Sequence, residues 1–243
     1  MVLNDKKTEL VHFSSKFIKT QWEPVVKVGD SEIRPSKQAK NLGVIMDHSL
    51  TMTSHVNNVC RSAMFGIRKI GQIRQYLSKE ATVKLVHAFV TSKLDSCNSL
   101  VFGLPERDLM KLQRVQNTAA RLVLSVSRRE HITPALELLH WLPVRQRAMF
   151  KILLITFKAM NGKAPAFISD LVTLHNPSRA LRSSADVRLY VGKWSTKYYG
   201  ERSFSVAAAK LWNGLPAGIR TASSISSFKS KLKTHLFKEY FNL

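Results

Sequence analysis

The stretch TMTSHVNNVCRSAMFGIRKIGQIRQY, residues 51–76, decides the fold class of this chain. Its apolar side chains recur every three or four residues, which predicts an amphipathic helix with one buried side. These side chains are Val56, Val59, Cys60, Ala63, Ile67, Ile70 and Ile73. Other positions hold basic residues, namely Arg61, Arg68, Lys69 and Arg74. We therefore expect a helix that packs through one side and presents cations elsewhere.

The same periodicity continues along most of the remaining chain. Ser78 is a favourable N-cap for a second helix, which has Glu80 in its first turn. A third helix is predicted from about residue 106 to 126, with Lys111, Arg114 and Arg121 beside its apolar stripe. Further helices are predicted at residues 133–139 (Thr133 as N-cap), 143–160 (apolar on nearly every side, hence central), 203–212 and 224–241.

The first 50 residues favour strands instead. Residues 25–28 and 31–33 flank Gly29-Asp30, which is the form of a hairpin with a two-residue turn. Residues 9–13 alternate in part, and residues 41–47 form an apolar run of strand length. We therefore predict a mainly α protein with a small β-rich piece at its N-terminus, α+β overall.

This pattern divides the chain into three parts. Residues 1–50 form the β-rich piece, residues 51–130 a helical bundle, and residues 131–243 a basic helical region with a loop-rich segment at 172–200. In that segment, Trp194, Tyr198 and Tyr199 lie near Lys193 and Lys197. These rings could stack on nucleic-acid bases, or pack against the last helices.

Charge is the strongest compositional feature: 38 basic against 16 acidic residues give a net charge of +22. Such a body repels itself, and a phosphate backbone relieves the repulsion most effectively. A solvated basic surface, a ribosome-like protein or a membrane-surface protein are the alternatives. No apolar run approaches the roughly 20 residues that span a bilayer, and no apolar signal segment follows Met1. We expect a nuclear or cytoplasmic protein that is not secreted.

Sequence motifs for catalysis are absent. The chain has no Gly-x-Ser-x-Gly nucleophile motif and no phosphate-binding loop of the NTPase type. Its two cysteines, Cys60 and Cys97, cannot form a four-ligand zinc site, and no paired cysteine or histidine motif supplements them. We therefore predict no catalytic residue, no metal ligand and no cofactor.

Five segments together resemble one family, the reverse transcriptases of non-LTR (LINE-type, Jockey-like) retrotransposons, in the region downstream of the catalytic palm. They are residues 3–9 (LNDKKTE), 40–47 (KNLGVIMD), 112–122 (LQRVQNTAARL), 138–147 (LLHWLPVRQR), and 199–216 (YGERSFSVAAAKLWNGLP) followed by residues 227–237. Their order and spacing fit the family over nearly the whole chain.

The resemblance implies an RNA-directed DNA polymerase in which paired aspartates hold two Mg²⁺ ions. This chain has no Asp-Asp dipeptide, and its scattered acids, such as Asp5, Asp47 and Asp95, are poor metal ligands. By the resemblance it begins after the catalytic motif, so we expect it to be inactive alone. Palm and fingers would come from a longer polyprotein.

By the same resemblance, Lys7 belongs to a palm motif, Leu42-Gly43-Val44 to a primer-contacting turn, and residues 51–130 to a helical thumb. The thumb would bind RNA or an RNA–DNA hybrid through phosphates. The candidate phosphate-binding residues are Lys7, Arg61, Arg68, Lys69, Arg74, Lys111, Arg114 and Arg121. For each of them a solvated helix surface is the other interpretation. A domesticated scaffold or interaction protein that no longer needs RNA is the alternative function.

Overall fold

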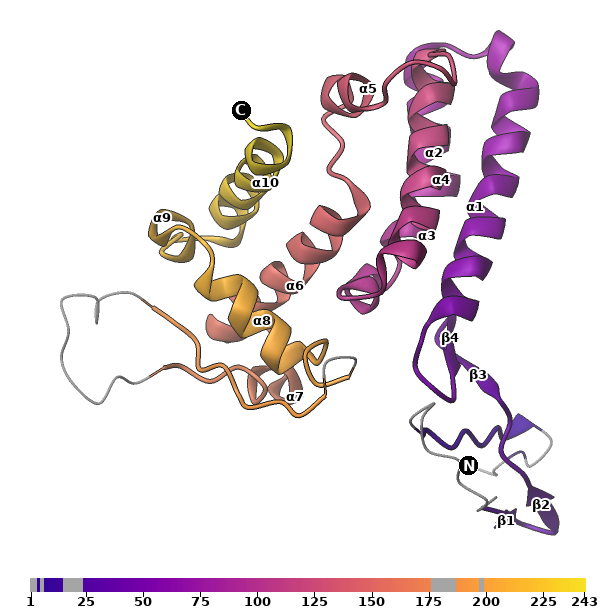
Figure 1. Cartoon of the computed structure of the whole chain (residues 1–243), viewed down its shortest axis with the longest axis vertical. Coiled ribbons are helices and arrows are strands. Elements are labelled where there is room, and N and C mark those ends of the chain that lie inside the picture. The colour runs from indigo at the N-terminus through magenta and orange to yellow at the C-terminus, as the bar shows by residue number, and fades with distance from the viewer. Residues whose placement is uncertain (1–3, 5–6, 15–23, 176–186, 197–198) are drawn as a thin grey trace.

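In the computed structural model the protein is mainly helical, with a small β region near its N-terminus (Figure 1). The described residues are 4, 7–14, 24–175, 187–196 and 199–243. The predicted fold class is confirmed. The strands are β1 (Val26–Val28), β2 (Ser31–Ile33), β3 (Gln38–Asn41) and β4 (Val44–Asp47). The α-helices are α1 (Thr53–Ile73), α2 (Lys79–Val86), α3 (Ser92–Asp95), α4 (Glu106–Leu124), α5 (Thr133–Leu138), α6 (Val144–Met160), α7 (Ala166–Ser169), α8 (Phe204–Asn213), α9 (Ala217–Arg220) and α10 (Ile225–Phe241). Shorter turns are η2 (Arg74–Tyr76), the π-helical η3 (His87–Thr91) and η4 (Asn98–Val101).

The strands form two antiparallel hairpins. The hairpin of β1 and β2 is confirmed, with Val28 opposite Ser31 across the predicted turn. The single strand predicted over residues 41–47 is wrong, because Leu42 and Gly43 form a turn between β3 and β4. Both turn residues have positive φ (47° and 87°), as tight hairpin turns require. The strand predicted at residues 9–13 is also wrong, since only Leu10 forms an isolated bridge there, to Pro35.

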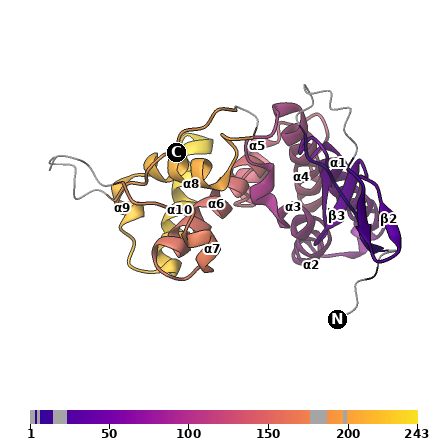
Figure 2. The same ribbon diagram turned by 90° about the horizontal axis from the view of Figure 1, so that it is seen from below.

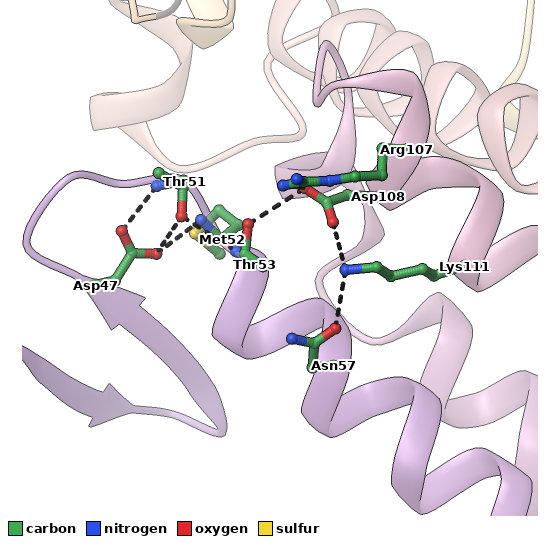
Figure 3. Close-up of polar contacts among 8 residues, drawn as sticks. All are labelled: Asp47, Thr51, Met52, Thr53, Asn57, Arg107, Asp108 and Lys111. Carbon is green, nitrogen blue, oxygen red and sulfur yellow. Dashed lines mark hydrogen bonds and ion pairs between the residues drawn. The ribbon is translucent and has the colours of Figure 1, made fainter. Parts of the chain in front are cut away.

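Asp47 organises the turn that leads from β4 into α1. One carboxylate oxygen accepts a hydrogen bond from the Thr51 amide at 2.9 Å, and the other accepts one from the Met52 amide at 2.8 Å (Figure 3). Leu50 and Met52 both have positive φ, which costs energy for residues other than glycine. The carboxylate therefore stabilises a strained turn that sets the direction of α1.

Helices α1 and α4 run parallel and pack directly against each other, and α2 and η3 run back alongside both of them (Figures 1 and 2). Contacts at both ends establish the direction. Thr53 and Asp108, at the beginnings of α1 and α4, share a hydrogen bond, while Arg74, directly after α1, bonds to Leu122 near the end of α4. Gly66 lets α1 approach η3 closely, because a Cβ there would lie 3.1 Å from the carbonyl oxygen of Phe89.

Helix α6 lies between two apolar clusters, as its composition predicted. Val144 and Ala148 pack in the cluster of α1 and α4, while Leu153 and Phe157 pack in the cluster of α8 and α10. The start of α6 is held by α4, because the Gln113 side chain accepts a hydrogen bond from the Val144 amide at 2.9 Å. Two of the segments that carry the family resemblance therefore contact each other directly.

Helices α8 and α10 lie where the sequence predicted them, whereas the short helices α7 and α9 were not predicted. Ser224 caps α10 through a hydrogen bond from the Ser227 amide at 3.1 Å, and Phe228 stacks on Phe157 with ring centres 4.2 Å apart. One detail is wrong: Ile132, not Thr133, occupies the cap of α5, and Thr133 is its first helical residue. Among the described residues, none of the helices has both the length and the hydropathy to cross a membrane.

Arg202 connects all three parts of the chain that the sequence divided. Its guanidinium donates hydrogen bonds to the carbonyl oxygens of Leu50, Leu100 and Phe102 at 3.3–3.4 Å. Arg202 belongs to residues 199–216, the last of the segments that carry the resemblance. This segment therefore packs on both the β region and the helical bundle. The three-part division itself stays a prediction.

We predict that Asp47→Ala lowers the free energy of unfolding by about 2 kcal/mol, because the amides of Ser49, Thr51 and Met52 lose their charged acceptor at a strained turn. Chemical denaturation followed by circular dichroism measures this. Asp30→Ala is the matched control, since Asp30 lies in the exposed β1–β2 turn and its side chain has no hydrogen bond within the described residues. Equal stability of the two variants would contradict the claim that the Asp47 carboxylate stabilises the turn between β4 and α1.

Candidate nucleic-acid interface

Basic side chains of α1 and α4 share one outer surface, which we call the α1–α4 basic face. Residues spaced by three, four or seven positions project from the same side of a helix. The α1–α4 basic face comprises Arg61 and Arg68 of α1 with Arg107, Lys111, Arg114 and Arg121 of α4. The Lys111 ammonium of α4 donates to the Asn57 side chain of α1 at 3.1 Å, so the basic side of α4 adjoins α1 at this point. Because the helices run parallel, the two rows of cations continue side by side.

Asp108 fixes this alignment from beneath the face (Figure 3). Its side chain is only 1% exposed. The carboxylate accepts hydrogen bonds from Lys111 at 2.8 Å and from the Thr53 hydroxyl at 3.2 Å, and Arg107 lies 3.6 Å away. Burial alone would raise the pKa of Asp108, but the hydrogen bonds and charges of Lys111, Thr53 and Arg107 outweigh it and hold the pKa below its usual value. The buried acid is therefore ionised at neutral pH.

Three of the predicted phosphate-binding residues bind other parts of the protein. Arg74 donates to the carbonyl oxygens of Leu122 and Val123 at 3.0 and 3.2 Å, so it caps the end of α4. Arg121 donates to the carbonyl oxygens of Ser127 and Glu130. Lys111 is paired with Asp108. For these three residues the structure shows a stabilising role that the sequence did not reveal.

Three other predicted residues are available to a ligand. The side chains of Arg61, Arg68 and Arg114 are exposed and have no polar or aromatic partner in the described part of the chain.

Lys69 lies about 100° further round α1 than Arg68, with its ammonium 5.7 Å from the Phe65 ring. Lys7 is exposed in the N-terminal segment and belongs to neither helix, so the structure does not bring it onto the basic face.

Arg107 is a member of the face that the sequence reasoning missed. Its side chain is 75% exposed, and it lies one helical turn before Lys111. The same spacing that identified Lys111 and Arg114 could have found it.

The charge of the face is left uncompensated along most of its length. The sequence has no acidic residue between Asp47 and Glu80, so α1 carries none. The acids of α4 lie in its first turn, where Asp108 is buried and Glu106 forms an ion pair with Arg145. A surface of this kind attracts polyanions over the distance of a Debye length, about 8–10 Å in physiological salt.

The aromatic residues considered for base stacking have contacts of their own. The Lys210 ammonium lies 3.8 Å from the centre of the Trp194 ring, and the Tyr199 hydroxyl donates to the Ser49 carbonyl oxygen at 2.9 Å. These contacts favour packing over base stacking for both rings. Tyr198 and Lys197 lie outside the described residues, as do residues 3 and 5–6 of the first resembling segment.

The Mg²⁺ ions that the family resemblance implies do not fit the acids that the structure describes. Asp47 binds backbone amides, Asp95 forms a two-point ion pair with Arg147 at 2.9 and 3.0 Å, and Asp108 binds Lys111. No cluster of three potential metal ligands occurs among the residues placed by the structure.

We predict that Asp108→Asn lowers the free energy of unfolding by about 2 kcal/mol at pH 7, because a buried ion pair loses its acid. The folded pKa is depressed, so this stability is complete above the ordinary value of 3.8 and is lost as the pH falls through the lower folded pKa. Urea denaturation across pH 2.5–7 should show the two proteins converge at the acid end.

Glu106→Gln is the control for that measurement. Glu106 lies in the same turn of α4, but it pairs with Arg145 at the surface, so its loss should cost less than about 1 kcal/mol. An Asp108→Asn variant as stable as Glu106→Gln at pH 7 would show that the buried acid does not align the helices.

Neither a family model, nor a curated protein, nor a solved structure matches this chain. The resemblance to non-LTR reverse transcriptases therefore stays a prediction that rests on the five segments quoted from the sequence.

Proposed function

We propose that the protein binds RNA or an RNA–DNA duplex, and that the α1–α4 basic face contacts the sugar-phosphate backbone. The observation that carries this proposal is the set of exposed, unpaired arginines Arg61, Arg68 and Arg114 on two parallel helices fixed by a buried ion pair. The rows from Arg107 to Arg121 and from Arg61 to Arg68 extend about 21 Å and about 10 Å along their helices.

Such a surface suits binding that does not depend on base sequence. Arginines on rigid helices can contact successive phosphates without entering a groove. In A-form duplexes the deep major groove excludes side chains, so recognition depends on backbone and shape. We therefore expect affinity for structured RNA and hybrids with little sequence preference.

We further propose that the chain is the thumb and downstream region of a non-LTR reverse transcriptase and does not extend primers by itself. The resemblance of the five segments and the missing Asp-Asp dipeptide support this proposal. In this proposal the palm and fingers of a longer polyprotein would be its partners.

We predict that the triple variant Arg61→Glu, Arg68→Glu, Arg114→Glu weakens binding to an RNA duplex by roughly 100-fold at low salt. The slope of log affinity against log salt should also fall by about one for each phosphate that the variant no longer neutralises, about three in all. Fluorescence anisotropy of a labelled duplex, titrated at several salt concentrations, measures both quantities.

The triple variant Lys163→Glu, Lys229→Glu, Lys238→Glu is the matched control, because it changes the net charge equally and all three lysines are exposed away from α1 and α4. It should retain most of the affinity and the salt slope. An equal loss in both variants would show that affinity follows net charge and not this face. If the affinity of the wild-type protein for the RNA duplex did not change with salt concentration, the alternative of a scaffold that needs no RNA would be favoured.

A further inference from the structure

A second site lies away from the α1–α4 basic face, in a cavity of about 350 Å³. Its walls come from α3, η3, η4, the turn before α6, and the helices α6 and α10. Contacts of α6 with α10, with η4 and with α3 place these elements around it (Figure 1). The volume falls within the range of about 300–1,000 Å³ that is typical of small-molecule sites.

One residue of the cavity lining, Asn98, has a buried side-chain oxygen that lacks a hydrogen-bond donor. Asn98 is 4% exposed, and its side-chain oxygen has no hydrogen-bond partner among the described residues. Its amide nitrogen donates to Asp95 at 3.3 Å, which fixes the orientation of the amide because its oxygen could not donate there. A buried acceptor left unpaired costs free energy, but this oxygen is closed to solvent and therefore offers no contact to a ligand in the cavity.

The same cavity presents two lysines. Lys151 of α6 and Lys233 of α10 line it, both are exposed, and neither has a partner within the described ranges. Arg147 also lines it, but Asp95 already neutralises this arginine through two hydrogen bonds. Asp95 is thereby paired, so the two lysines give the cavity lining a net positive charge.

Rings and apolar side chains form the remaining walls. Phe150, Trp141 and His87 line the cavity, and the rings of Trp141 and His87 are 5.6 Å apart. Burial, with a smaller contribution from the charge of Arg147, lowers the pKa of His87. Its ring is therefore neutral at pH 7 and serves as an aromatic wall.

We propose that this cavity binds a nucleoside monophosphate unit. The base lies against the rings of Phe150, Trp141 and His87, while Lys151 and Lys233 bind the phosphate. Inorganic phosphate would leave the rings unused, and an uncharged aromatic compound would leave both lysines unpaired. The site uses no residue of α1 or α4, so it does not depend on the function proposed above.

Isothermal titration of the full chain with AMP, ribose 5-phosphate, adenosine and inorganic phosphate tests each part of the proposal. AMP should bind at least roughly tenfold more tightly than ribose 5-phosphate, which lacks the base, and more tightly than adenosine, which lacks the phosphate. Absence of AMP binding at millimolar concentration would overturn the proposal, as would equal affinities for AMP and ribose 5-phosphate.

The double variant Lys151→Glu, Lys233→Glu should lose AMP binding by at least tenfold while its weak affinity for adenosine stays the same. Lys163→Glu with Lys238→Glu is the matched control, because these lysines are exposed, lie outside the cavity and change the net charge equally. AMP binding that is unchanged in the first variant, or reduced equally in both, would overturn the site.

Free nucleotides and unpaired nucleotides of an RNA strand both present this unit. To decide which of the two occupies the cavity, octaadenylate is titrated into the Arg61→Glu, Arg68→Glu, Arg114→Glu variant with and without saturating AMP. Displacement of the oligonucleotide by AMP assigns the cavity to RNA strands, and AMP binding without displacement assigns it to free nucleotides. Loss of duplex binding in that variant with intact AMP binding shows that the two sites are independent.

Discussion

One buried carboxylate joins the beginnings of α1 and α4, above the apolar side chains that pack the two helices together. Asp108 binds Lys111 of its own helix and Thr53 of α1, and Lys111 continues the network to Asn57. A buried ionised acid is unfavourable unless cations and hydrogen bonds surround it, so it admits few alternative arrangements of the two helices. The parallel alignment that results places the arginines of both helices on one surface.

Internal contacts divide the cations into two groups. Arg74 and Arg121 are hydrogen-bonded to carbonyl oxygens, and Lys111 is paired with the Asp108 carboxylate. Arg61, Arg68 and Arg114 remain exposed on the helices that these contacts stabilise. With 16 acids against 38 basic residues, internal pairing cannot neutralise the surface. The free arginines are therefore available to the polyanion that we propose as the partner.

The sequence predicted the helices well, because their apolar periodicity and caps such as Ser78 are local signals. It failed where tertiary contacts decide. Residues 41–47 contain a turn at Leu42-Gly43, which the apolar run concealed. The spacing of Arg74 and Arg121 resembles that of Arg114, and only the packed structure shows which of them cap a helix or a loop. The cavity beside α6 and α10 could not be found either, because its walls come from segments far apart in the sequence.

Arginine footprinting tests the central claim most directly. The chain is treated with an arginine-selective dicarbonyl reagent, with and without an RNA duplex, and modification at each arginine is measured by mass spectrometry. The account predicts that RNA protects Arg61, Arg68, Arg107 and Arg114, while Arg74, held by carbonyl oxygens, reacts slowly in both states. Protection confined to arginines outside α1 and α4, with these four still modified, would contradict it.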